Sequence, residues 1–175
     1  MKNQKIKALI LAFFLIVSCA TTKKNGGEKV KTTIYCMPNN MTTYNRGILT
    51  FPFEYKKYGI KIEVDNATFE TELYKKLPKR PRSYGKFGLR IKIVTSKNDT
   101  IFMSYLPRAR IIYKGKSIRG TPELLHLVTS KIKEHYEQED FVCEGSKCTK
   151  EIKQKNIDFF NRVLKNCEEY INKED

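Results

Sequence analysis

The sequence of 175 residues contains no tryptophan and only two histidines, His126 and His135. It also lacks the glycine-rich loops that bind phosphates or dinucleotides, the HExxH zinc motif and the GxSxG turn of many serine hydrolases. No cofactor motif is therefore present. Both histidines are expected on helix surfaces or borders, so the sequence favours a non-catalytic protein.

Long apolar runs are also scarce. The longest covers residues 8–17 (ALILAFFLIV), and as a helix it would extend about 15 Å, half of a roughly 30 Å bilayer core. It is too short for a stable transmembrane helix, but it suits the apolar region of a signal peptide. Lys2, Lys5 and Lys7 supply the positive segment that precedes such a region.

The apolar run ends in a short motif, Ile16-Val17-Ser18-Cys19. This motif resembles the lipobox of bacterial lipoproteins, with Ile16 at a position where Leu is commoner. In that class the cysteine thiol receives diacylglycerol, the chain is cut before it, and the new amine is acylated. The resemblance implies lipidation at Cys19 and anchoring to the inner or outer membrane of a bacterial cell envelope. An ordinary secretory peptide and a buried N-terminal helix are the alternatives.

Residues 20–33 (ATTKKNGGEKVKTT) contain no apolar cluster and include Gly26-Gly27, as is typical of a flexible linker. The sequence thus predicts a signal peptide at residues 1–18, a lipidated tether at 19–33 and a single domain at 34–175. The remaining length suffices for one hydrophobic core.

Four cysteines follow the predicted lipidation site: Cys36, Cys143, Cys148 and Cys167. An even number in an oxidising compartment favours disulfides, with three possible pairings. A Cys143–Cys148 bridge would close a short Gly-containing turn, and a Cys36–Cys167 bridge would close a long loop that stabilises more. Cys167 also fits a plain core thiol on a helix. A zinc site with the two histidines is disfavoured, because the spacing lacks CxxC-like pairs.

Between Ile34 and about Tyr113 the apolar pattern has period two, which predicts half-buried antiparallel strands. The expected strands lie at residues 49–55, 60–64, 69–73, 89–94, 101–106 and 109–113. Four acidic residues at alternate positions are expected on the polar faces of these strands rather than in a paired-carboxylate site: Glu63, Asp65, Glu70 and Glu72.

The pattern then changes to that of helices. Thr121-Pro122 is a good helix start, and Leu124, Val128, Ile132 and Tyr136 follow at spacing four. A second helix is expected from about Lys150 to Asn172, with one face formed by Ile157, Phe160, Leu164, Cys167 and Ile171. The prediction is an α+β domain, an antiparallel meander of about six strands packed by two C-terminal helices.

Positive charge is concentrated in one part of the chain. The formal net charge is +15, and without the three lysines of the leader it is +12. Residues 73–122 contain fourteen lysines and arginines but one acid, Asp99, whereas the rest of the mature chain is near −1.

A hairpin centred on Lys97-Asn98 would pair Arg90 with Tyr105 and Lys92 with Met103. This register puts a mixed basic and apolar surface on one face and places Phe102 and Leu106 in the core. Clustered guanidinium and ammonium groups suit phosphate or carboxylate partners. The candidate anion-binding residues are Lys79, Arg80, Arg82, Arg90, Lys92, Arg108 and Arg110. The alternative is a solvated sheet face with no ligand.

The leading hypothesis is a lipid-anchored binding or accessory protein whose basic sheet region contacts an anionic lipid, a glycan or an acidic protein. Nucleic acid is not expected as a partner, because the predicted compartment is extracytoplasmic. One alternative is an inhibitor or immunity-type lipoprotein that blocks a protein partner. Another is an enzyme acting on envelope polymers through carboxylates or the two histidines.

Overall fold

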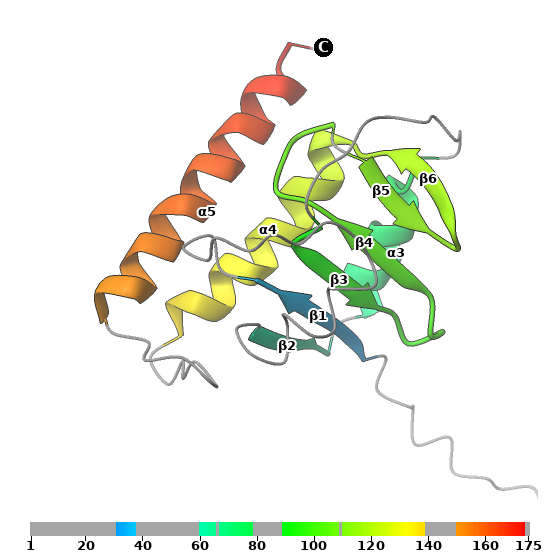
Figure 1. Ribbon diagram of the computed structural model, residues 1–175, viewed down its shortest axis with the longest axis horizontal. Helices are drawn as coiled ribbons and strands as arrows, with labels where there is room; N and C mark the ends of the chain where they lie inside the picture. Colours follow the sequence, from blue (N-terminus) through cyan, green and yellow to red (C-terminus); the bar gives the residue numbers. More distant parts are fainter. Residues whose placement is uncertain are drawn as a thin grey trace, which may run out of the picture.

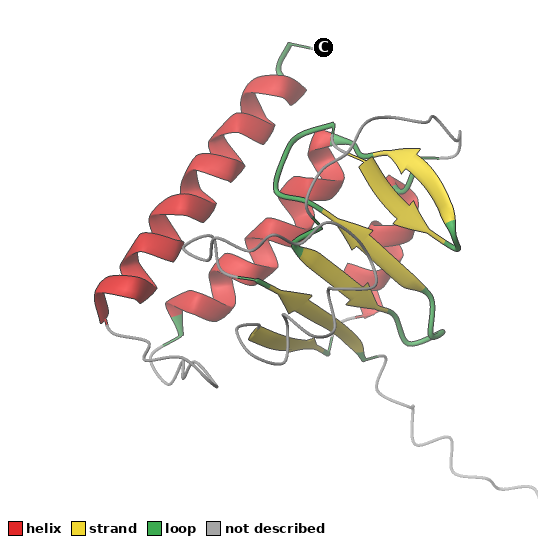
Figure 2. Ribbon diagram, in the orientation of Figure 1, coloured by secondary structure: helices red, strands yellow, loops and turns green. Residues whose placement is uncertain are grey.

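The computed structural model describes residues 31–37, 60–65, 67–78, 89–108, 110–138 and 150–173. In this part of the chain one six-stranded antiparallel sheet is packed by helices, which confirms the α+β class (Figures 1 and 2). The strands are β1 (Thr32–Cys36), β2 (Ile60–Val64), β3 (Ile91–Val94), β4 (Thr100–Met103), β5 (Arg110–Tyr113) and β6 (Lys116–Arg119). The helices are α3 (Ala67–Lys76), α4 (Pro122–Glu137) and α5 (Lys150–Ile171). The strand expected at 49–55 lies outside the described residues, and β1 begins two residues before the expected domain start.

The strand order is β2-β1-β3-β4-β5-β6. Strands β3 to β6 form the expected meander. At the other side of the sheet β1 lies between β2 and β3 and is antiparallel to both. Strands β2 and β3 therefore run in the same direction, and the connection between them contains α3.

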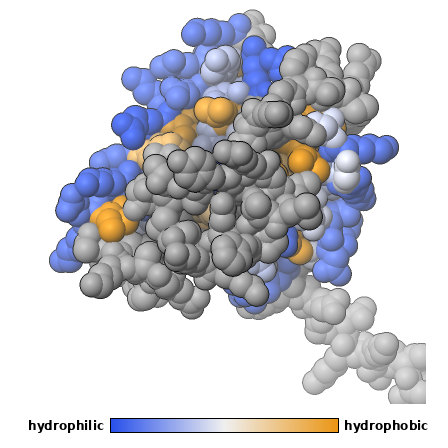
Figure 3. All heavy atoms as spheres, viewed as in Figure 1, coloured by the Kyte–Doolittle hydropathy of each residue, from blue (hydrophilic) through white to orange (hydrophobic). Residues whose placement is uncertain are grey.

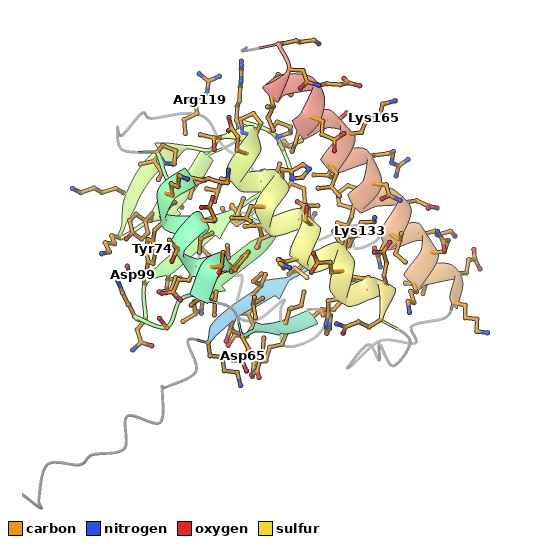
Figure 4. All side chains as sticks on the ribbon, turned by 180° about the vertical axis from the view of Figure 1, so that it is seen from behind. Asp65, Tyr74, Asp99, Arg119, Lys133 and Lys165 are labelled. Carbon is orange, nitrogen blue, oxygen red and sulfur yellow. The ribbon has the colours of Figure 1, made fainter. Side chains whose placement is uncertain are left out.

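One face of the sheet builds the core against the helices. In β2 the residues Ile60, Ile62 and Val64 are buried and Lys61 and Glu63 are exposed, as the period-two pattern predicts. Figure 4, viewed from behind, shows α3 and α4 on this face and α5 alongside α4. The buried side chains of the sheet, α3, α4 and α5 belong to a single cluster.

The start of α4 follows the sequence prediction closely. The Thr121 hydroxyl accepts a hydrogen bond from the Leu124 backbone N–H at 3.2 Å, and Pro122 occupies the first turn. The four predicted core positions of α4 are all buried: Leu124, Val128, Ile132 and Tyr136. The helix is therefore fixed by its cap and by the stripe that covers the sheet.

The buried face of α5 differs in detail from the prediction. Phe160 and Cys167 are fully buried as expected, but Val163 is buried where Leu164 was expected, and Leu164 is half-buried. Asn156 completes the buried stripe. The helix is rotated slightly relative to the predicted face, since residues three and four apart both lie on one side of a helix.

The predicted strand at 69–73 is wrong, because these residues lie in α3. Phe69 and Leu73 are both buried, and a spacing of four satisfies both a period of two and the helical period. Leu77, four residues further, is also buried, which continues the helical stripe. Thr71, expected on the same strand face, is exposed and donates a hydrogen bond to the Ala67 carbonyl oxygen.

The register expected for the β3–β4 hairpin is also wrong, by one residue. Ile91 pairs with Met103, and Lys92 pairs with Phe102. The connecting turn explains the shift: the Asn98 N–H bonds to the Thr95 carbonyl, and Asn98 itself has a φ of 61°. This is a three-residue loop whose last residue is left-handed, and its odd length reverses the faces of the second strand.

The shifted register changes which side chains reach the core. Met103 and Tyr105 are buried among the core residues, whereas Leu106 is 63 % exposed. Phe102 lies on the face away from α3 and α4, where Lys92 was correctly expected. The β5–β6 hairpin closes through Lys114 and Gly115, both with positive φ, as a two-residue turn of this kind requires.

The predicted Cys36–Cys167 disulfide is absent, and both residues are buried free thiols. The thiol of Cys36 lies by the hydroxyl of Tyr105, whose ring packs on Phe160. Cys167 is seven residues beyond Phe160, about two turns further along the helix. Cys143 and Cys148 lie outside the described residues.

We expect both buried thiols to resist alkylation in the folded protein. Burial raises the pKa of Cys36 to about 12 and that of Cys167 to about 11, so neither forms the reactive thiolate at neutral pH. Mass spectrometry after iodoacetamide treatment should show labelling of these two positions only when denaturant is added. A peptide cross-linked between Cys36 and Cys167 in protein from the native host would contradict this arrangement.

Candidate anion-binding surface

The seven predicted anion-binding residues do not form one surface within the described part of the chain. Three of them, Lys79, Arg80 and Arg82, lie outside the described residues. Arg90 directly precedes β3 and Lys92 is the second residue of that strand. The Lys92 side chain is on the face of the sheet away from α3 and α4. We call this side of the sheet the open face, because no described helix packs on it; it nevertheless has a small cluster of its own, in which Met37 and Leu89 are buried against Tyr35, Phe102 and Ile112.

Lys92 has apolar neighbours on the open face. Its ammonium nitrogen lies 5.4 Å from the centre of the Tyr35 ring, and Phe102 is its partner on β4. Phe102 in turn pairs with Ile112 on β5. The face therefore combines a cation with aromatic and aliphatic side chains, as the sequence suggested. The apolar residues on it differ from the predicted Met103 and Tyr105.

The other two predicted residues lie elsewhere. The guanidinium carbon of Arg108 is 5.0 Å from the centre of the Tyr170 ring on α5, so this side chain holds the loop against the helix. Arg110 begins β5 and pairs with Arg119, the last residue of β6. In Figure 4, Arg119 lies far from the labelled Asp99, towards the other end of the sheet.

A second group of cations gathers where the hairpin turns meet. The strand register places six strand ends at the same end of the sheet. Three strands begin there, at Thr32 (β1), Thr100 (β4) and Lys116 (β6), and three end there, at Val64 (β2), Val94 (β3) and Tyr113 (β5). We call this the turn end of the sheet. It carries three exposed lysines, Lys97, Lys114 and Lys116, which we call the turn lysines. Figure 3 shows hydrophilic side chains at the side of the molecule where these hairpins lie.

Asp99 organises the turn end. One of its carboxylate oxygens accepts hydrogen bonds from the hydroxyls of Tyr74 at 2.9 Å and Tyr113 at 3.0 Å. The same oxygen lies 3.2 Å from the Lys114 ammonium. Burial alone would raise the pKa of Asp99, but these three contacts outweigh it and hold the pKa below its ordinary value. Asp99 thus stays charged, and this oxygen is engaged within the fold.

The two tyrosines that bind Asp99 also carry the lysines. The Lys97 ammonium is 5.5 Å from the centre of the Tyr74 ring, and the Lys114 ammonium is 5.2 Å from the centre of the Tyr113 ring. Burial and the nearby Asp99 raise the pKa of Tyr74 to about 12, so its hydroxyl remains a donor. One carboxylate therefore positions two aromatic rings, and each ring holds an ammonium group at the surface.

A second carboxylate, Glu70, joins the β3–β4 turn to the first strand. Glu70 is only 5 % exposed and accepts hydrogen bonds from the Thr32 hydroxyl at 2.7 Å, the Ser96 N–H at 2.9 Å and the Ser96 hydroxyl at 2.7 Å. Burial acts to raise the pKa of Glu70, but the hydrogen bonds together lower it. Its expected place on the polar face of a strand was wrong, because it points from α3 into the turn end.

Acidic charge at the turn end comes from the β2 side, from Asp99 and from the buried Glu70, whose carboxylate also interacts electrostatically with Lys97. Glu63 forms ion pairs with Lys31 and with Lys61, the latter at 2.6 Å, so its charge is matched within the sheet. Asp65, just after β2, is exposed. Among the described residues, Lys97 and Lys116 form no ion pair with an acid. The surface formed by β3 to β6 is consequently positive.

The sequence contained part of this site. Asp99 stood out as the one acid among fourteen basic residues, and a hairpin turn at Lys97-Asn98 was expected. Neither pattern indicated that Asp99 would bind tyrosines from a helix and from a distant strand. That arrangement depends on α3, which was expected to be a strand.

Little in the described residues suggests catalysis. His126 lies on α4 with its Nε2 atom 3.4 Å from a Glu168 carboxylate oxygen, so it bridges the two C-terminal helices. A shallow hollow beside the start of α4 is lined by Leu106, Ile111, Leu125 and four other residues, none of which is titratable. Within the described ranges no three His, Cys, Asp or Glu side chains group as metal ligands.

Comparisons with known proteins identify no family for this chain. No protein-family model, curated protein or solved structure matches the chain. A search of the described helices finds none with the length and apolar character of a membrane span.

We expect Glu70→Gln to lower the free energy of unfolding by about 2 kcal/mol at pH 7, because it weakens charge-assisted hydrogen bonds to buried donors. A depressed carboxylate pKa stabilises the fold above the ordinary pKa, and this contribution is lost as the pH falls through the lower folded value. The difference between variant and wild type should therefore shrink below about pH 4.

Urea unfolding followed by circular dichroism at pH 7 and at pH 3 measures both effects. Glu72→Gln is the matched control, since Glu72 lies on the same helix in a half-buried position and pairs with Lys75 at 3.5 Å. It should change stability by less than about 0.5 kcal/mol. Equal losses for the two variants would show that the Glu70 contacts are not important.

Proposed function

We propose that this chain is a lipid-anchored protein of the bacterial cell envelope that binds an anionic partner through the basic region of its sheet, without catalysing a reaction. The anchor is supported by the basic leader, the ten-residue apolar run and the lipobox-like motif that ends at Cys19. The binding role is supported by the turn end, where cations are held in place by the fold.

The observation that carries the binding role is the engagement of Asp99 within the fold. Its carboxylate already contacts Tyr74, Tyr113 and Lys114. Asp99 and the buried Glu70 supply two negative charges beside the three turn lysines, and Lys97 and Lys116 form no ion pair within the described part of the chain. A surface with this excess of positive charge is suited to an external anion.

The chemistry of the turn lysines indicates the class of partner. Lysine ammonium groups are strongly hydrated point charges on flexible stems, and they bind phosphate and carboxylate groups without the fixed bidentate geometry of arginine. The partner is therefore expected to present several anionic groups over an area rather than one group in a pocket. Polyanionic surfaces and polymers of the envelope have this property.

The anchor is tested by mass spectrometry of the protein purified from its native host in neutral detergent. The N-terminal peptide should begin at Cys19 and carry a diacylglyceryl group on the thiol and an acyl chain on the amine. A peptide that retains residues 1–18, or one with an unmodified Cys19, would reject the anchoring part of the proposal.

The binding role is tested by the salt concentration that elutes the detergent-solubilised protein from immobilised heparin, a polyanion. The combined variant Lys97→Gln, Lys114→Gln and Lys116→Gln should elute at clearly lower salt. Each substitution removes an ammonium group that can contact an anionic group of heparin, and such contacts are weakened by salt. Circular dichroism checks that the variant is folded.

The matched control replaces three exposed cations of the C-terminal helix and its end: Arg162→Gln, Lys165→Gln and Lys173→Gln. It removes the same charge from another side of the molecule, where Figure 4 shows Lys165 on α5, away from the turn end. If both triple variants elute alike, net charge alone explains retention, and the turn end is not a binding surface.

A further inference from the structure

We infer that the anionic partner of the turn lysines is the phospholipid headgroup surface of the membrane that carries the anchor, and that the domain docks on it with its turn end. This inference rests on the proposed lipid anchor and names the partner of the proposed binding surface. It follows from where the chain enters the sheet.

The chain enters the domain at the turn end. β1 begins at Thr32, which pairs with Val64 at the end of β2, and the next residue pairs with Val94 at the end of β3. The turn that carries Lys97 lies directly beyond Val94, and the turn that carries Lys114 lies at the same end of the sheet. Figure 1 shows the start of β1 on the same side as the β3–β4 turn.

A buried contact fixes this relationship. The Glu70 carboxylate binds the Thr32 hydroxyl and the Ser96 backbone and hydroxyl groups. The point of chain entry and the turn beside Lys97 are thus joined through a single side chain in the core. The lysines cannot rotate away from the point where the anchored segment begins without breaking these hydrogen bonds.

The length of the N-terminal segment keeps the turn end near the bilayer. Twelve residues separate Cys19 from Thr32, and twelve residues span at most about 40 Å even when fully extended. Short connections of this kind give effective concentrations in the millimolar range, so weak contacts with the surface suffice for docking. The part of the domain that approaches the lipid most easily is the end to which the segment is attached.

The charge of this end suits an anionic bilayer. Electrostatic attraction acts over about 8 Å at physiological salt, so only side chains that project towards the surface contribute. The turn lysines are exposed on or beside tight turns. Of the acids at this end besides Asp99, Glu63 is paired with Lys31 and Lys61, Glu70 is buried and Asp65 is exposed. Lysines near an anionic membrane surface each favour binding by roughly fivefold. A headgroup layer also offers the extended field of phosphates that these flexible side chains can share.

The docked domain is tested by hydrogen–deuterium exchange of the full lipidated protein in nanodiscs. One set of discs contains phosphatidylcholine only, and the other contains equal parts of phosphatidylcholine and phosphatidylglycerol. Amides of residues 95–99 and 113–116 should exchange several-fold more slowly on the anionic discs, whereas those of residues 150–173 should be unchanged. The protection should disappear at high salt.

The variants used for heparin retention make the test specific. The combined Lys97→Gln, Lys114→Gln and Lys116→Gln variant should shift the docking equilibrium by about 100-fold and abolish the protection. The Arg162→Gln, Lys165→Gln and Lys173→Gln control should keep it. Because wild-type exchange on the two discs is informative by itself, the inference stays testable even if the turn variant is poorly folded.

The outcomes separate this inference from the proposed function. Equal exchange on both discs, with Cys19 lipidated and heparin retention intact, would overturn membrane docking and leave a soluble polyanion or acidic protein as the partner. Protection of α5 in place of the turns would show that another surface docks. An unmodified Cys19, found by mass spectrometry, would instead reject the anchor on which the inference depends.

Discussion

The structure depends on one buried carboxylate more than on any other polar group. Glu70 accepts three hydrogen bonds that connect α3 with the start of β1 and with the β3–β4 turn. A charged group of this kind is tolerated in the interior only when its hydrogen-bonding capacity is well used. The contact ties a helix to segments 38 and 26 residues away along the chain, and thereby fixes the end of the sheet where Asp99 and its tyrosines assemble.

The parts of the fold that the sequence predicted are those governed by local chemistry. Thr121 and Pro122 define a helix start wherever they occur together before an amphipathic stretch, and the alternation in β2 specifies which side chains are buried. The concentration of basic residues was likewise visible without a structure. Its separation into an open face, a turn end and a contact with α5 was not, because these positions depend on strand register.

The errors have specific physical causes. The sequence Phe69-Glu70-Thr71-Glu72-Leu73 fits both a strand and a helix, and only packing on the sheet decides between them. In the β3–β4 hairpin, the left-handed Asn98 closes a loop of three residues, whereas a turn centred on Lys97-Asn98 has an even number, and this difference reverses the faces of β4. The roles of Glu70 and Asp99 could not be predicted for the same reason, since both depend on α3 lying across the strand ends.

The outermost strands of the described sheet have a consequence for solubility. β2 and β6 occupy the two borders, and both carry basic residues: Lys61 on β2, and Lys116 and Arg119 on β6. A border strand invites pairing with another chain through its backbone, and charged side chains, lysine above all, discourage such pairing. On β2 the charge of Lys61 is matched by Glu63, whereas β6 carries only basic charges, so two β6 borders brought together would place like charges side by side and resist pairing.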